Sequence, residues 1–214
     1  STMGEIAPAD EDMLYQMFGI DAELLIDHAW GREPVTMADI KSYKPKSNSV
    51  SSGQVLPRDY SYEEARLAVK EMADLLALEL VEKGLVTDSI TLHVGYSNRL
   101  ERKPAHGTIT MTVTTSSARQ IMAYTEKLFE RIVNPHVSVR RMNVTFNHVV
   151  DEAYKQYDLF TDPAEMEREH RLQTAMLDIK GKFGKNAILK GMNLQESATA
   201  MERNGQIGGH KSGV

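Results

Sequence analysis

Two short stretches, SITLHVGYS (89–97) and GTITMTVTT (107–115), decide the fold that this sequence predicts. In each stretch apolar residues alternate with polar ones, which is typical of a β-strand that buries one of its two faces. The loop between them is basic, so the two strands are expected to form a hairpin with a cationic tip. The buried faces would carry Ile90, Leu92, Val94 and Tyr96 in the first strand and Ile109, Met111 and Val113 in the second.

The hairpin is flanked on each side by one helix and one further strand. Ser61, with Glu64 three residues later, predicts a capping box at the start of a long helix. A second helix is predicted at about 117–133, and extended segments at about 47–56 and 136–146 complete the order β-α-β-β-α-β. This order is the split βαβ arrangement. It predicts an α+β fold with a four-stranded antiparallel sheet and both helices on one face.

Helical segments are also predicted before and after this domain. Residues 13–31 carry apolar residues at helical spacing, whereas 32–49 lose this periodicity and contain two prolines, which is typical of a linker. Asp162 and Pro163 predict the start of another helix, and the basic, glycine-rich stretch 185–214 is expected to be largely flexible. The predicted domains are an N-terminal helical region (1–40), a linker (41–48), the sheet domain (47–150) and a C-terminal tail (151–214).

The composition excludes several kinds of chemistry. With 214 residues and 41% hydrophobic content, the chain resembles an ordinary soluble protein. It contains no cysteine, which rules out disulfides, thiolate metal ligands and thiol nucleophiles and is consistent with a reducing, cytoplasmic location. No apolar run approaches the roughly 20 residues that cross a membrane, and there is no signal peptide, so no membrane partner is expected.

Motifs for small-molecule chemistry are also missing. The sequence has no glycine-rich phosphate loop of the Walker form and no His-Glu-x-x-His motif, and its seven histidines are scattered without ligand spacing. Glu169 and His170 are neighbours on a charged helix and are interpreted as solvated. We therefore expect no metal, no cofactor and no small-molecule substrate in this chain.

The formal net charge is −5, but it is unevenly distributed. Residues 1–40 hold nine acidic residues against the single base Arg32, whereas 88–148 hold eight bases and four acids. Residues 41–60 are also basic, with a net charge of +3. A basic surface on an acidic molecule is compatible with nucleic acid as a partner of the sheet domain.

The face of the hairpin opposite the apolar one is polar. In the second strand it would present four hydroxyl groups in a row, from Thr108, Thr110, Thr112 and Thr114. Threonine is also a good strand former, so β-propensity alone would explain this row. The adjacent loop adds three cations, Arg99, Arg102 and Lys103.

The last predicted strand contains a change of phase. Val139 belongs to one pattern of alternation and Met142 to the other, so one additional residue has to be accommodated at Arg140 and Arg141. A β-bulge there would keep both arginines out of the core and direct them toward the threonine face, where guanidinium groups suit phosphate. The alternative is an arginine pair that is merely solvated or bridged to acids. With the loop cations, the two arginines favour a surface that follows a nucleic-acid backbone.

An apolar pair, Leu159 and Phe160, stands in a polar neighbourhood after the last strand. Exposed apolar side chains surrounded by polar ones are typical of contact sites. The pattern formed by Gln156, Asp158, Leu159 and Phe160 resembles the short peptide by which bacterial replication and repair polymerases bind the sliding clamp. The alternative is that the apolar pair packs under its own domain.

Three stretches, in this order, resemble the C-terminal part of a Y-family translesion DNA polymerase of the UmuC/DinB class. They are KSNSVSSGQVLPRDYSYEEA (46–65), VRRMNVTF (139–146) and QYDLF (156–160). In that family the β-α-β-β-α-β unit is the little finger domain, which grips the major groove of DNA. TMGEIA (2–7) looks like the end of the helix-hairpin-helix thumb, and ERNGQIGGHK (202–211) is similar to the tail of Gram-positive UmuC-like members.

The resemblance implies partners and roles. It implies binding of template-primer DNA, with Arg140, Arg141, Lys46 and Ser47 at positions that contact DNA in the family, and a tether to the sliding clamp. It also implies a function in DNA damage tolerance within the SOS response. The polymerase activity of the family needs a palm domain with metal-binding carboxylates, which would use Mg²⁺ and lie upstream. We therefore expect a non-catalytic C-terminal fragment in which Ser1 is a cloning remnant.

Two other functions use the same order of elements. An RRM-like RNA-binding domain needs aromatic side chains on the exposed face of its central strands, where this sequence has threonines. A ferredoxin-like domain that senses a small molecule would bind its ligand at a dimer interface.

Overall fold

The chain folds into two units, Ser1–Lys46 and Ser47–Val214. The computed structural model describes residues 2–19, 21–33, 35–42, 48–97, 102–154 and 162–206. In its described part, the first unit consists of helices α1 (Met3–Ile6), α2 (Glu11–Phe18), α3 (Asp21–Ala29) and α4 (Met37–Ser42).

Helix α4 lies in a stretch for which the sequence pattern predicts no helix. Its start is fixed by a reciprocal pair of hydrogen bonds, because the Thr36 N–H donates to Asp39 Oδ2 over 2.9 Å and the Asp39 N–H donates to Thr36 Oγ1 over 3.2 Å. The helix spans six residues, fewer than two turns, so it has no apolar periodicity to detect.

The second unit has the predicted order of elements. It runs β1 (Val50–Tyr60), α5 (Tyr62–Glu82), β2 (Leu85–Tyr96), β3 (Ala105–Thr115), α6 (Ala118–Ile132) and β4 (Val139–Asn147). The elements that follow are β5 (Val150–Asp151), η1 (Glu152–Tyr154), α7 (Pro163–Phe183), η2 (Gly191–Leu194) and α8 (Ala200–Asn204).

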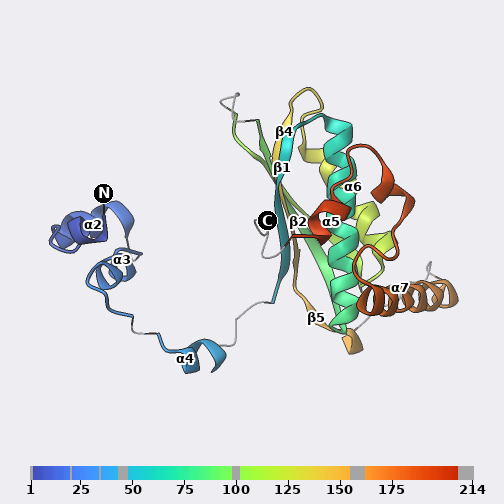
Figure 1. Ribbon diagram of the computed structural model, residues 1–214, viewed down its shortest axis with the longest axis horizontal. Coiled ribbons are helices and arrows are strands. Elements are labelled where there is room, and N and C mark those ends of the chain that lie inside the picture. The colour runs from blue at the N-terminus through green and yellow to red at the C-terminus, as the bar shows by residue number, and fades with distance from the viewer. Residues whose placement is uncertain are drawn as a thin grey trace. The chain divides into compact units, whose positions relative to one another are not determined.

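The sheet is antiparallel, with the strand order β1-β4-β2-β3 and with β5 paired to the start of β2. Helices α5 and α6 lie on the same side of it (Figure 1). The predicted α+β fold is therefore confirmed. Strand β1 is at the edge of the sheet, which explains why it tolerates Pro57, a residue without an N–H group for a strand partner.

The core lies between the sheet and the two helices. The apolar residues predicted on β2 and β3 are buried there, together with Phe129 from α6, Phe146 from β4 and Met72 from α5. The rings of Tyr62 and Phe129 pack at 5.1 Å between centroids. Each fully buried Phe or Met contributes about 1.5–3 kcal/mol of hydrophobic stabilisation. The alternation of the strands thus leaves one sheet face for the core and the other for solvent.

The start of α5 is capped as predicted. The Glu64 N–H donates to Ser61 Oγ over 3.4 Å, and the Ser61 N–H donates to Glu64 Oε2 over 2.8 Å. Arg58 adds a bidentate contact, with Nη2 2.6 Å and Nη1 3.1 Å from the two Glu64 oxygens. The Arg58 guanidinium, the Ser61 N–H and the Ser197 hydroxyl together hold the pKa of Glu64 far below its usual value.

Helix α7 is attached to the start of α6. Glu169 accepts hydrogen bonds from Ser117 Oγ over 2.7 Å and from the Arg119 N–H over 2.9 Å, so its carboxylate caps the N-terminus of α6. Gln173, which is buried, donates to the Ser116 carbonyl over 3.2 Å. The carboxylate of Glu169, interpreted from the sequence as solvated, thus has a structural role.

Residues 185–206, here called the C-terminal segment, pack on the outer side of α5. The sequence predicts that much of this stretch is flexible, and for these residues that prediction is wrong. Asn193 and Thr199 are buried, and both donate hydrogen bonds to Glu71, from Asn193 Nδ2 and from the Thr199 N–H, each over 2.7 Å. Lys190 Nζ lies 2.5 Å from Asp74 Oδ1.

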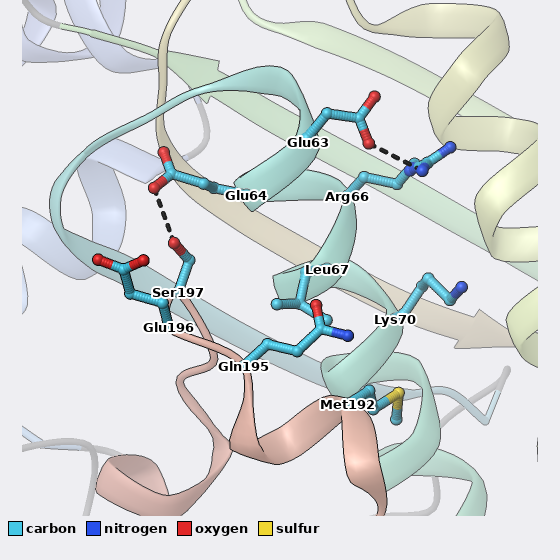
Figure 2. A pocket seen from close by; sticks show the side chains of 9 residues that line it. All are labelled: Glu63, Glu64, Arg66, Leu67, Lys70, Met192, Gln195, Glu196 and Ser197. Carbon is cyan, nitrogen blue, oxygen red and sulfur yellow. Dashed lines mark hydrogen bonds and ion pairs between the residues drawn. The ribbon is translucent and has the colours of Figure 1, made fainter.

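A crevice remains between the first half of α5 and the C-terminal segment. Figure 2 shows Ser197 facing Glu64 across it, and the Ser197 hydroxyl donates to Glu64 Oε1 over 2.7 Å. Its cations, Arg66 and Lys70, are paired with neighbouring carboxylates, including Glu126. The two cations of the crevice therefore belong to a network of internal charge pairs and are not available to an anionic ligand.

Candidate nucleic-acid interface

The side of the sheet away from α5 and α6, here called the open face, is polar except for Val55 of β1, which is exposed opposite Arg141. Its residues alternate with the buried ones along each strand, and strand pairing places them in rows across the sheet. All the side chains in two of these rows are exposed or half-exposed. The first row is Thr145, Thr91 and Thr108, and the second is Asn143, His93 and His106.

Hydrogen bonds within the open face order several of these groups. Thr91 Oγ1 and Thr108 Oγ1 are 2.8 Å apart, and Asn147 Nδ2 donates to Thr91 Oγ1 over 2.9 Å. Thr145 Oγ1 donates to Asn143 Oδ1 over 2.9 Å. The open face therefore presents pre-positioned hydroxyl and amide groups, the neutral hydrogen-bonding groups that accompany cations in phosphate contacts.

The other predicted threonines lie further along β3. Thr110 is exposed, opposite Ser89 of β2. Thr112 Oγ1 is 3.4 Å from the hydroxyl of Tyr124 on α6. The hydroxyl group of Thr112 thus contacts α6 from β3, the edge strand of the sheet.

The predicted β-bulge in β4 is confirmed. Gly95 pairs with Arg141 but the next residue, Tyr96, pairs with Val139, so Arg140 is the additional residue. Arg141 is exposed on the open face and Arg140 is half-buried. Within the described residues neither guanidinium group forms an ion pair or a hydrogen bond. Arg141 is thus a permanent positive charge that remains available to a ligand.

Of the three cations predicted in the β2-β3 loop, Arg102 and Lys103 are among the described residues and Arg99 is not. The Arg102 guanidinium lies 5.7 Å from the ring centroid of Tyr96, and this ring belongs to the core side. Lys103 is exposed. The remaining predicted residues fall outside the described ones: Lys46, Ser47, Arg99, Gln156, Asp158, Leu159 and Phe160.

A hollow beside β1 brings further cations close to the open face. It is lined by Arg141 and His93 from the open face and by Lys180, Lys185 and Arg203 from α7 and the C-terminal segment. Burial lowers the pKa of Lys180 and of Arg203, and nearby carboxylates oppose this effect. Glu79 and Glu82 also line the hollow, but Glu79 is neutralised by Lys83, whose Nζ lies 2.5 Å away.

Three polar residues of the open face were not predicted as site residues. His93 and His106 face each other across β2 and β3, with 6.0 Å between ring centroids, and Asn143 pairs with His93 from β4. The alternation of β2 and β4 already indicates the face on which they lie. Their proximity depends on strand register, which periodicity does not determine.

The open face does not have the aromatic side chains of an RRM. At the described positions of β2, β3 and β4 it presents threonine, histidine, asparagine and arginine, and the aromatic residues Tyr96 and Phe146 belong to the core. Base stacking on exposed aromatic rings is the main means of RNA recognition in that fold. On the described part of this face the only aromatic rings are the imidazoles of His93 and His106, so the RNA-binding alternative lacks the Phe, Tyr or Trp side chains on which that fold stacks bases.

No metal centre is found in the part of the chain that the structure describes, where no three His, Cys, Asp or Glu residues are grouped suitably for a metal ion. His170 Nδ1 on α7 lies 3.5 Å from Glu152 Oε1 on η1. Among the described helices, none is both long and apolar enough to cross a membrane.

Comparison with known proteins identifies relatives of the whole chain. UvrX of Bacillus subtilis is 29% identical over 214 residues, which are 99% of this chain and 50% of that protein. DNA polymerase IV of Pelotomaculum thermopropionicum is 26% identical over 96% of this chain and 49% of its own length. The chain thus spans about half the length of these curated relatives.

A chain from the insertion ternary complex of Dbh DNA polymerase also matches, with a TM-score of 0.40 and 15% identity over 71% of this chain and 42% of that chain. This likeness is too low to add to the assignment. The model of the impB/mucB/samB family C-terminal domain matches residues 47–159, more than half of the chain. This chain therefore belongs to the impB/mucB/samB family and contains the C-terminal, little finger region of the Y-family DNA polymerases.

Proposed function

We propose that this chain is the DNA-binding part of a translesion DNA polymerase, and that its open face holds the backbone of template-primer DNA. The observation that carries the proposal is Arg141, an exposed cation on a β-bulge with no partner among the described residues. Family membership and the relatives named DNA polymerase IV support DNA as the ligand.

The chemistry of the open face suits a backbone rather than bases. On the same face as Arg141, strand pairing places the Asn143 amide in the next row and the hydroxyl groups of Thr91 and Thr108 in the row after it, and such groups bind phosphate and sugar without regard to sequence. The cations Lys180, Lys185 and Arg203 line the hollow beside β1 and would extend the positive surface past the sheet edge. Binding by these groups releases counterions from DNA, so affinity should depend steeply on salt.

Fluorescence anisotropy with a labelled primer-template duplex tests this proposal. Affinity should fall steeply with salt, and Arg140→Ala combined with Arg141→Ala should weaken binding and reduce the slope of log K against log salt by about two. The matched control is Lys127→Ala with Arg171→Ala, which removes two exposed cations from α6 and α7. An arginine variant that binds like the control would overturn the proposal.

We also propose that Gln156, Asp158, Leu159 and Phe160 tether the enzyme to the sliding clamp. The support is the sequence pattern and its place in the chain, between η1, which follows β5, and the start of α7. An apolar Leu-Phe pair entering a pocket would provide most of the binding energy, as anchors do in other peptide complexes.

Surface plasmon resonance with immobilised clamp tests the tether. Leu159→Ala with Phe160→Ala should remove clamp binding, while Tyr157→Ala, a neighbouring aromatic outside the pattern, serves as the control. Circular dichroism should show an unchanged fold in both variants. Clamp binding that survives the loss of Leu159 and Phe160 would refute the tether.

Polymerase activity is proposed only for the whole protein. Among the described residues no three His, Cys, Asp or Glu side chains are grouped for a metal ion, and we assign no catalytic residue to them. The upstream sequence of the natural gene provides the test. A palm-like segment with paired carboxylates would support the parent enzyme, and its absence would argue against it.

A further inference from the structure

Arg141 does not extend freely from the sheet but lies across the neighbouring strand. Strand pairing places it opposite Gly95 of β2. A Cβ atom added to Gly95 would lie 2.4 Å from both Cγ and Nε of Arg141 and 2.9 Å from its Cδ. Gly95 is buried although it belongs to the open face, because the stem of Arg141 covers it.

The backbone does not require a glycine at this position. Among the glycines only Gly19, Gly31, Gly84 and Gly184 have a positive φ in the described part of the chain, and Gly95 is paired within β2. A glycine inside a strand costs about 0.5–1 kcal/mol relative to alanine, and in a central strand it often marks a close approach of another group. The close approach at Gly95 is that of Arg141.

A second glycine repeats this arrangement on the other side of β4. Gly53 of β1 pairs with Asn143, and a Cβ at Gly53 would lie 3.1 Å from Asn143 Nδ2. Two of the open-face side chains of β4 therefore lean over glycines in opposite directions, Asn143 over β1 and Arg141 over β2. Both polar side chains thus lie against a neighbouring strand where a glycine provides the space.

We infer that Gly95 is a positioning residue for DNA binding, because it provides the space in which Arg141 lies across β2 toward β3. This inference rests on the proposed function. A guanidinium group already held along the surface loses less side-chain freedom on meeting a phosphate than one that extends into solvent. A methyl group at position 95 would lift the stem and misdirect the charge without removing it.

A double-mutant cycle in DNA affinity tests the inference. Arg141→Ala should weaken binding about fivefold to tenfold, the loss of one phosphate contact. Gly95→Ala should weaken it by a similar factor and lower the salt slope as Arg141→Ala does. The double variant should bind no more weakly than Arg141→Ala alone, since both changes remove the same contact. Gly191→Ala is the control, because a Cβ there meets nothing within 4 Å.

Two outcomes would overturn the inference. One is wild-type affinity in Gly95→Ala, and the other is a double variant whose loss equals the product of the two single losses. If the wild-type chain itself does not bind DNA, the proposed function fails, while the position of Arg141 can still be measured.

That separate measurement is the heteronuclear NOE of the arginine side-chain Nε–Hε groups in the wild-type chain. Arg141 should be ordered, whereas Arg168, which is exposed and forms no hydrogen bond or ion pair within the described residues, should be mobile. Equal mobility of the two groups would overturn the inference even if Gly95→Ala did not fold.

Discussion

The open face and the outer side of α5 use charge in opposite ways. On the open face, Arg141 is exposed and has no partner among the described residues. On the outer side of α5, Glu71 and Asp74 are buried, and the C-terminal segment supplies a partner to each. Buried charges that maintain the fold thus already have hydrogen-bond or ion-pair partners within the chain, whereas the charge assigned to DNA binding has none among the described residues.

Desolvation explains the difference. A buried carboxylate is costly unless hydrogen bonds and counter-charges compensate it, so Glu71 and Asp74 bind their partners permanently. An exposed guanidinium stays hydrated and can exchange water for phosphate. Substitutions should therefore separate the two regions, with stability effects on the outer side of α5 and binding effects on the open face.

The largest expected effect is on the α5 side. Glu71→Ala should lower the free energy of unfolding by about 3 kcal/mol, because it leaves the donors of Asn193 and Thr199 buried without their acceptor. Chemical denaturation measures this loss. Glu79→Ala on the same helix is the control and should change stability by less than about 0.5 kcal/mol, since its ion pair with Lys83 is exposed. Equal losses of unfolding free energy in both variants would show that burial of the carboxylate does not determine its contribution to stability.

A smaller loss is expected at the second buried carboxylate. Lys190→Ala leaves Asp74, whose side chain is 5% exposed, without its cation and should cost about 2 kcal/mol. Adding Asp74→Asn should recover part of the loss, because the uncompensated charge is then gone. Because Lys190 lies on the outer side of α5 and not on the open face, Lys190→Ala should leave DNA affinity unchanged, which the anisotropy assay can check.

Arg141→Ala should show the reverse behaviour. Its side chain is exposed and unpaired among the described residues, so the free energy of unfolding should change by less than about 0.5 kcal/mol while DNA affinity falls. Thermal unfolding monitored alongside DNA titration gives both quantities on the same sample. A large loss of stability would mean that Arg141 maintains the fold and would weaken its assignment to DNA.

The smallest effect concerns pH. The pKa of Glu64 is depressed in the folded chain, so its ionised form contributes stability above the unfolded value of about 4.3 and loses it as the pH falls toward the folded value. Glu64→Gln should therefore be less stable than the wild type at pH 7, and the difference should shrink between about pH 5 and pH 3. Denaturation midpoints across this range measure it, and a constant difference would show that the Arg58 contact does not depend on the charge.

The sequence predicted those parts of the fold whose signals are local. The alternation of apolar and polar residues predicted β2 and β3, and capping residues such as Ser61 predicted the start of α5. The change of phase in that alternation near Arg140 predicted the bulge. The packing of the C-terminal segment could not be predicted, because its contacts are polar and join residues far apart, such as Lys190 and Asp74. In the sequence, Glu71 and Asp74 look like ordinary charges of an exposed helix face.

The candidate site was predicted only in part for a related reason. The type of each residue identified Arg141 and the threonines, but the rows that add His93 and Asn143 depend on strand register. The covering of Gly95 by Arg141 depends on a side-chain conformation. Neither is encoded in the spacing of residues along one strand.

The most direct test is to map the DNA footprint by NMR. A primer-template duplex is titrated into the isotope-labelled chain, and backbone amide shifts are followed in the β2, β3 and β4 strands and at Asn193 and Thr199. The largest changes should occur on the strands, around Thr91, His93, Asn143 and Arg141, whereas the amides of Asn193 and Thr199 should barely change. Changes concentrated at the C-terminal segment, with an undisturbed open face, would contradict this prediction.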